Sequence, residues 1–248
     1  MIIIIALTSI IIFAICRQAL GAPLISLYIF VCALIFLAGF IFFTRVPHIP
    51  MKNNSVTVTD FITNLKKWNE WFPKIKFNGL ALMIDMYCVS FFSAALLYIY
   101  NDSRPGVGQV PLFGEGTYLV SHDWFFAITN CLTFAGDTVS RKYAYWAKPR
   151  SPLLYLLLSI IGAAACLSKI AILAPLGMFC VFFANGAIYG TSTRYIDNAV
   201  DKRYNLIALS IWLFIGDLGS VTGSNTYEYI IAGLCTNHGK HICVHKTA

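Results

Sequence analysis

Two residues of opposite charge, Asp137 and Arg141, lie one helical turn apart in the apolar stretch LTFAGDTVSRKY, residues 132–143. A spacing of four places both side chains on one face of a helix, where the carboxylate can orient the guanidinium. Together they present a hydrogen-bond acceptor and a planar fork of donors, which suits a polar ligand with hydroxyl groups and ring nitrogens. The alternative is structural: Arg141 extends its long side chain toward water, and Asp137 only accompanies it.

Two more aspartates, Asp85 and Asp217, also stand inside long apolar segments. An ionised side chain at the centre of a bilayer costs about 2.5–3.5 kcal/mol on insertion scales, so such residues usually face a bundle interior or a wet passage. Three roles stay open for each aspartate: a protonated structural acid, the partner of a cation, or a proton-linked site.

The composition predicts that most of the chain is surrounded by lipid and not by water. Of the 248 residues, 58% are hydrophobic and only 12% are charged, and the mean hydropathy is +0.71. A soluble domain of this size needs a larger charged shell, whereas runs of about 20 apolar residues match the thickness of a bilayer. The sequence therefore predicts an all-α, polytopic helical membrane protein with the lipid bilayer as its first partner.

Seven apolar segments are predicted to be transmembrane helices, the first of them short. They cover residues 1–16, 22–43, 77–101, 124–147, 152–168, 171–190 and 206–231. Between the second and third, Phe61, Leu65, Trp68 and Phe72 recur at steps of three and four, which predicts an amphipathic helix in the headgroup layer.

These segments divide the chain into four parts. We expect two helices of a first bundle at 1–44, a cytosolic loop at 45–76, a five-helix bundle at 77–233 and an extracellular or luminal tail at 234–248.

The basic residues predict the orientation. Thirteen of the 18 Lys and Arg residues lie in the segments 45–76, 141–150 and 191–204, which strict alternation of seven spans places on one side. By the positive-inside rule that side is the cytosol, so the N-terminus is cytosolic and the C-terminus is extracellular or luminal. The net charge of +7 thus needs no nucleic-acid partner, and there is no basic-aromatic patch of the RNA-binding kind.

The segment TFAGDTVSR resembles the signature of the equilibrative nucleoside transporters (solute carrier family 29), which reads Phe-Asn-x-x-Asp-x-x-Gly-Arg on their eighth helix. Asp137 and Arg141 match the two charged positions of that signature. Thr133 stands at the Phe position, Phe134 at the Asn position, and Ser140 at the Gly position.

Other segments resemble the same family in the same order. FFANGAIYGTS, residues 182–192, resembles the tenth helix, with Asn185 and Gly186 in its Phe-x-Asn-Gly element, and we interpret both as helix-packing residues. Residues 204–224 resemble the glycine-spaced eleventh helix, and Gly216, Gly219 and Gly223 there are interpreted as close-packing positions between helices.

The resemblance implies a partial major-facilitator-like bundle, helices five to eleven of an eleven-helix fold. It implies facilitative transport of adenosine- or uridine-type nucleosides by alternating access, with Asp137 and Arg141 lining the central cavity. Phe134 would offer a ring for base stacking in place of an amide. The first four helices of that fold, with their share of the pocket, are missing, so we expect a truncated sequence.

Two alternatives stay open. The chain could be a non-transporting membrane scaffold or assembly subunit, or a proton-linked carrier of another small solute that uses Asp217 or Asp85. We expect neither an enzyme nor a cofactor or metal, because no nucleophile–base arrangement, phosphate loop or metal-ligand cluster stands out.

Overall fold

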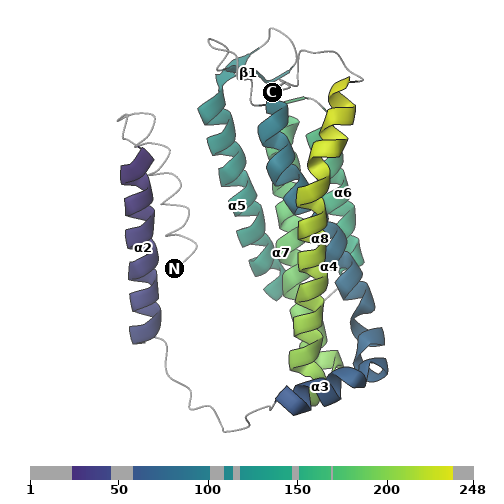
Figure 1. The fold of residues 1–248 in the computed structure, drawn as a ribbon. Coiled ribbons are helices and arrows are strands. Elements are labelled where there is room, and N and C mark those ends of the chain that lie inside the picture. Colours follow the sequence, from purple (N-terminus) through teal and green to yellow (C-terminus); the bar gives the residue numbers. More distant parts are fainter. Residues whose placement is uncertain are drawn as a thin grey trace. The chain divides into compact units, whose positions relative to one another are not determined.

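The computed structural model describes residues 24–45, 58–100, 109–113, 118–146, 151–168 and 170–236. The chain separates into two compact units, Met1–Val58 and Thr59–Ala248, and each is described by itself. In the first unit, helix α2 (Leu24–Arg45) covers most of the span predicted at 22–43 (Figure 1). The span predicted at 1–16 and most of the tail predicted at 234–248 lie outside the described residues.

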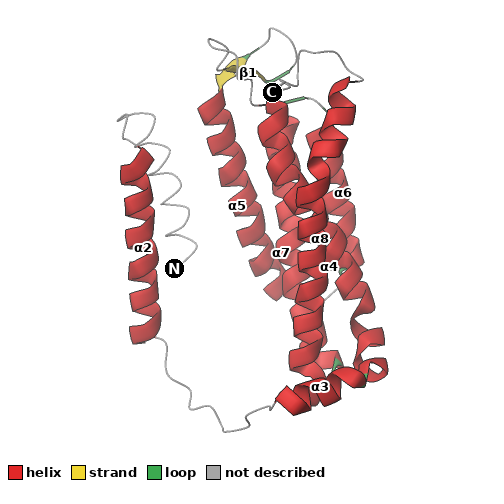
Figure 2. Cartoon of the chain, viewed as in Figure 1, coloured by secondary structure: helices red, strands yellow, loops and turns green. Residues whose placement is uncertain are grey.

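The second unit is a bundle of helices, as the ribbon in Figure 1 and the colours of Figure 2 show. Its helices are α3 (Val58–Lys66), α4 (Trp68–Tyr100), α5 (His122–Trp146), α6 (Leu153–Leu167), α7 (Leu173–Ala199) and α8 (Lys202–Thr236).

A short β-hairpin lies between α4 and α5, in a chain whose other described elements are helices, as the sequence predicts. Strand β1 (Gln109–Pro111) pairs antiparallel with β2 (Leu119–Ser121), and Val110 stands opposite Val120. Leu112, just after β1, accepts a 3.2 Å hydrogen bond from the backbone N–H of Ile172. The hairpin therefore fixes the turn that leads into α7.

Three of the described helices are long and apolar enough to cross a membrane: α4 over Trp68–Leu96, α7, and α8 over Lys202–Tyr227. Helix α6 is shorter, with 15 residues, and α5 is more polar. Helix α6 nevertheless exposes an apolar face that includes Leu157 and Ile161. Length, composition and this exposed face indicate a membrane-embedded protein.

Several helix boundaries differ from the sequence prediction. Helix α4 begins at Trp68 and not at residue 77, and α8 extends beyond both ends of the predicted span 206–231. The charged segment after residue 190, predicted as a loop, is helical up to Ala199, and only Val200 and Asp201 separate α7 from α8. Helix α7 continues because Ile196 is fully buried against the start of α8. The predicted amphipathic helix is also broken, at Lys67, between α3 and α4.

The helices of the second unit pack in a defined order. Helix α5 lies along α7, α8 lies along α4, and α4 and α7 contact each other between them, whereas α6 packs against both α7 and α4. Helices α5 and α8 therefore contact the central α4–α7 pair mainly through different members, α5 through α7 and α8 through α4.

Two hydrophobic cores fill the bundle, and a polar zone separates them. One core holds Trp71 and Ile75 of α4 with Trp212 of α8. The other holds Phe91 of α4 and Met178 of α7. Between these positions, α4 carries the buried Asp85 and α7 the buried Asn185. The polar zone thus falls at mid-length of the two central helices. Ionisable side chains inside membrane helices are costly and usually have a specific role.

Candidate functional site

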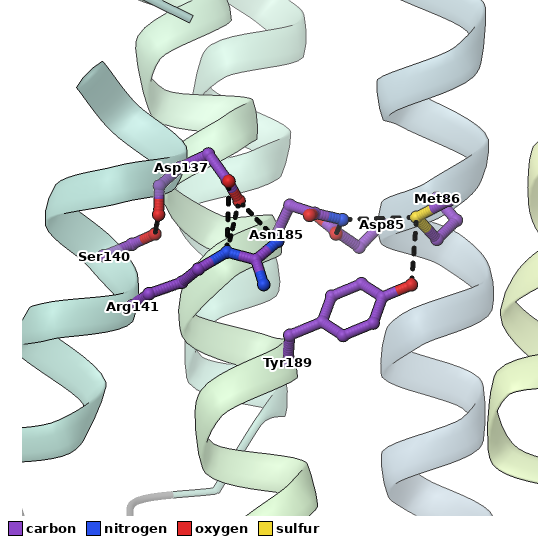
Figure 3. Close-up of polar contacts among 7 residues, drawn as sticks. All are labelled: Asp85, Met86, Asp137, Ser140, Arg141, Asn185 and Tyr189. Carbon is purple, nitrogen blue, oxygen red and sulfur yellow. Dashed lines mark hydrogen bonds and ion pairs between the residues drawn. The ribbon is translucent and has the colours of Figure 1, made fainter. Parts of the chain in front are cut away.

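Asp137 and Arg141 form an ion pair along α5 (Figure 3). The Arg141 Nε donates to both carboxylate oxygens, at 3.1 and 3.0 Å, and Nη2 lies 3.0 Å from Oδ1. The arginine side chain is 55% exposed and the aspartate 27% exposed. The pair is therefore formed locally but stays accessible from one side of the bundle.

The pair lies level with the middle of its neighbouring helix. A Cβ built on Gly186 would lie 2.7 Å from the Asp137 carbonyl oxygen and 3.1 Å from its Oδ1, and would also collide with Ser140 Oγ. Gly186 is the midpoint of α7 (Leu173–Ala199), about 20 Å from either end at 1.5 Å per residue. Asp137 is thus held far from the ends of α7, whereas Arg141 stands five residues before the end of α5 at Trp146, so the geometry leaves the surface-reaching role for Arg141 open.

Small residues on both helices allow this close approach. Gly136, Ser140 and Ala144 recur every four residues on α5, opposite Gly186 and Gly190 on α7. A Cβ on Gly190 would lie 2.7 Å from the Ala144 Cβ. Such small-residue seams let helix backbones approach closely in membranes, where packing rather than hydrophobicity drives association.

Tyr189 connects the ion pair to the central helices. The Arg141 guanidinium lies 5.6 Å from the centre of the Tyr189 ring, within the range of a cation–π contact. The Tyr189 hydroxyl points to the Met86 sulfur of α4 at 4.0 Å, and the ring packs edge-on against Trp212 of α8 at 5.3 Å. In Figure 3 the ring lies between Arg141 and Met86, so one aromatic side chain touches groups from three helices.

Asp85 has a different environment from Asp137. It is fully buried, and it accepts hydrogen bonds from Ser159 Oγ of α6 at 3.2 Å and from Asn185 Nδ2 of α7 at 2.8 Å. Within the part of the chain that the structure describes, no cation pairs with it. These bonds join α4, α6 and α7, which favours a structural acid among the three roles left open by the sequence.

Asn185 and Gly186 are adjacent on α7, and each contacts a different aspartate. Asn185 donates to Asp85, while Gly186 admits Asp137. Both were predicted as helix-packing residues, and the structure gives Asn185 the more specific place of a hydrogen-bond donor. A displacement of this point of α7 would therefore move both carboxylates.

The remaining predicted residues lie at two places. Phe134 is half-buried on α5, one turn before Asp137. Three glycines of α8 approach α4 closely, where added Cβ atoms would crowd Leu82, Met83 and Tyr87; they are Gly216, Gly219 and Gly223. Asp217, beside Gly216, is exposed and makes no hydrogen bond or ion pair with the described residues.

Sequence reasoning missed three residues of this region: Tyr189, Met86 and Ser159. Tyr189 stands four residues after Asn185, a spacing that places the two on one side of a helix. Ser159 interrupts the aliphatic run LLYLLLSIIGAAACL, and a lone hydroxyl there signals a buried hydrogen-bond partner. Met86 carries no such signal.

Among the described residues, no group of three or more His, Cys, Asp or Glu side chains could hold a metal ion. The fold and the site together define a class: a helical bundle with three helices long and apolar enough to cross a membrane, among the described residues, and an accessible acid–arginine pair level with the middle of α7. No protein-family model, curated protein or solved structure matches the chain.

Proposed function

We propose that the chain is the C-terminal part of a facilitative carrier that moves nucleosides across a membrane by alternating access. The observation that carries this proposal is the Asp137–Arg141 pair, which is accessible yet level with the middle of α7. An ion pair inside a bundle of membrane-length helices is costly in lipid and is typical of residues that face a solute pathway.

The chemistry of the pair suits a sugar. Arg141 donates to Asp137 Oδ1 from both Nε and Nη2, but Oδ2 accepts only from Nε and keeps a lone pair that can accept from a ribose hydroxyl. Arg141 keeps N–H groups that Asp137 does not use, and these can donate to the same hydroxyl oxygens. Tyr189 on α7 and Phe134 on α5 supply aromatic faces for the base.

The complete carrier, in this proposal, has a second wall. Carriers of this type bind the solute at the interface of two helix bundles near the midplane. The accessible side of Arg141 is where helices of the first bundle would close the site. We propose seven spans in this chain, with the basic segments 45–76, 141–150 and 191–204 toward the cytosolic side, so that the ion pair lies toward the cytosolic ends of its helices.

The test is binding of radiolabelled adenosine and uridine to the full chain in lipid nanodiscs. We expect saturable binding that Arg141→Ala weakens about tenfold or more, because a hydrogen bond to a charged group contributes about 1.5–3 kcal/mol. Arg203→Ala is the matched control, since that arginine is equally exposed, at 57%, but pairs with Glu70, the two residues lying in the first turns of α8 and α4. Equal affinity in wild type and Arg141→Ala would remove the pair from the site.

A second candidate, an assembly subunit, is favoured by one observation. Helix α8 exposes Phe214 and Val221 on the same helix as the uncovered carboxylate of Asp217, a surface that another protein could cover. This reading predicts a stable partner that co-purifies from detergent and no binding of either nucleoside. The nanodisc assay therefore separates the two candidates.

A further inference from the structure

Helix α3 lies across the end of the bundle at which α7 ends and α8 begins (Figure 1). Its Phe61 packs against the hydrophobic core that holds Trp71 of α4 and Tyr204 of α8. The Trp71 Nε1 also donates a 3.3 Å hydrogen bond to the Asn64 carbonyl oxygen of α3. These contacts hold α3 in a defined orientation against the start of α4.

The apolar face predicted for this amphipathic segment divides in the structure. Phe61 and Phe72 pack against the core, whereas Ile62, Leu65 and Trp68 are exposed. Trp68 is 54% exposed and touches only one edge of the Phe72 ring, with the ring centres 6.0 Å apart. This end of the bundle therefore presents apolar side chains to its surroundings.

The same segment carries positive charge that the protein leaves uncompensated. Lys66, Lys67 and Lys76 are exposed and form no ion pair with the described residues. The nearby Glu70 already pairs with Arg203 at 3.3 Å. An anionic partner can therefore approach these lysines without displacing an internal ion pair.

An apolar stripe begins on α4 where the basic residues end. Phe77, Leu80 and Ile84 are all exposed and follow one another at steps of three and four, which places them on one side of the helix. The Lys76 Nζ lies 5.0 Å from the centre of the Phe77 ring, so the ammonium group stands at the start of this stripe. A cation beside an apolar stripe matches a phospholipid, which joins an anionic headgroup to an acyl chain.

The depth of these residues fits the boundary of a bilayer. Asp85 in the polar zone follows Lys76 by nine residues and Trp68 by 17, which is about 14 and 26 Å at 1.5 Å per residue. Half of a bilayer measures about 15 Å in its hydrocarbon and about 20–22 Å with its headgroups. With the polar zone at the centre of the bilayer, Lys76 reaches the edge of the hydrocarbon, and α3 lies at the surface of the headgroups.

We infer that α3 and the first turns of α4 form a binding surface for anionic phospholipids of the adjacent leaflet. Lys76 binds the headgroup of a lipid whose acyl chain lies along Phe77 and Leu80. Lys66 and Lys67 attract further anionic headgroups to α3. The surface selects anionic over zwitterionic lipids, because a zwitterionic headgroup has no net charge with which to neutralise the lysines.

The experiment measures which lipid touches the stripe. The full chain with Leu80→Trp is placed in bilayers of phosphatidylcholine and phosphatidylserine in which only one of the two lipids has brominated acyl chains. Bromine quenches the fluorescence of a tryptophan that it contacts, so the quenching beyond that of wild type reports the lipid at residue 80. We expect phosphatidylserine to be enriched about fivefold or more, the effect of one lysine near an anionic surface. Added salt should reduce the enrichment.

Variants of the lysines assign the enrichment to this surface. Lys76→Gln should remove most of it, and the double variant Lys66→Gln/Lys67→Gln should reduce it as well. Lys202→Gln is the matched control and should leave it unchanged, because the Lys202 ammonium is already paired with Asp197 at 2.7 Å. Enrichment that survives in the triple variant of Lys66, Lys67 and Lys76 would contradict the inference.

A second reporter distinguishes a defined surface from general attraction to a basic protein. Phe214→Trp places a tryptophan on the exposed side of α8 at a depth similar to that of Leu80, because Gly79 lies against Ile215. There we expect less than about twofold enrichment. Equal enrichment at both reporters, or none at residue 80, would refute the inference. The assay contains no nucleoside, so its result is independent of the proposed function.

Discussion

Gly186→Ala tests the contact that holds Asp137 at mid-length of α7. The new methyl group would meet the Asp137 carbonyl oxygen at 2.7 Å and its Oδ1 at 3.1 Å, besides Ser140 Oγ. Ser140 is buried and its hydroxyl donates to the same carbonyl at 2.7 Å. The serine hydroxyl can rotate, but the carbonyl moves only with α5, so the helices must separate.

The expected change in the free energy of unfolding is the cost of overpacking minus the gain in helix propensity. Overpacking of this kind costs about 1–3 kcal/mol, while replacing glycine by alanine in a helix gains up to about 1 kcal/mol. We expect a net loss of about 1–2 kcal/mol, which lowers the midpoint of thermal unfolding by about 2–8 °C for a chain of this size. Nucleoside binding should weaken as well, because Asp137 is displaced.

Gly79→Ala is the matched control in the same unit. Its Cβ would meet only the Ile215 side chain, with the nearest atom, Cδ1, at 3.1 Å, and that side chain can rotate away. The control should therefore unfold at or slightly above the wild-type temperature in the same detergent. The double variant Ser140→Ala/Gly186→Ala should recover only part of the loss, since the carbonyl contact remains. A Gly186→Ala protein as stable as wild type would refute the close packing of α5 on α7.

Two further changes test the polar contacts away from the ion pair. Asp85→Ala should lower the free energy of unfolding by about 2–4 kcal/mol, because it leaves the Asn185 amide and the Ser159 hydroxyl without their buried acceptor. Asp85→Asn should lower it by less than about 1 kcal/mol. Equal unfolding temperatures for the two variants would contradict the structural role of Asp85. Glu70→Gln should change the free energy of unfolding by less than about 1 kcal/mol, because the side chains of Glu70 and Arg203 are each about half exposed. A large decrease in unfolding temperature that does not depend on salt would show that this ion pair contributes more than expected for an exposed pair.

The relation of Asp137 to Arg141 could be predicted from the sequence because it is local. A spacing of four on a helix fixes the geometry of the pair before any tertiary contact forms, and the structure has that ion pair. The positions of α2, α5 and α6 followed likewise from run length, with α6 within one residue of its predicted ends. The end of α7 did not, because the burial of Ile196 depends on helix α8.

The partners of the other acidic residues were decided by the tertiary structure. Asp85 finds Ser159 and Asn185, 74 and 100 residues further along the chain, and nothing in the local sequence around Asp85 specifies either. Gly186 admits Asp137 only because the small residues of α5 and α7 meet in one register. Sequence alone determined which residues are costly in lipid and which of them share a helix face. The close packing of helices at glycine residues decided that Asp85 is buried and that Asp137 stays accessible. This outcome depends on how closely the backbones of distant segments approach one another.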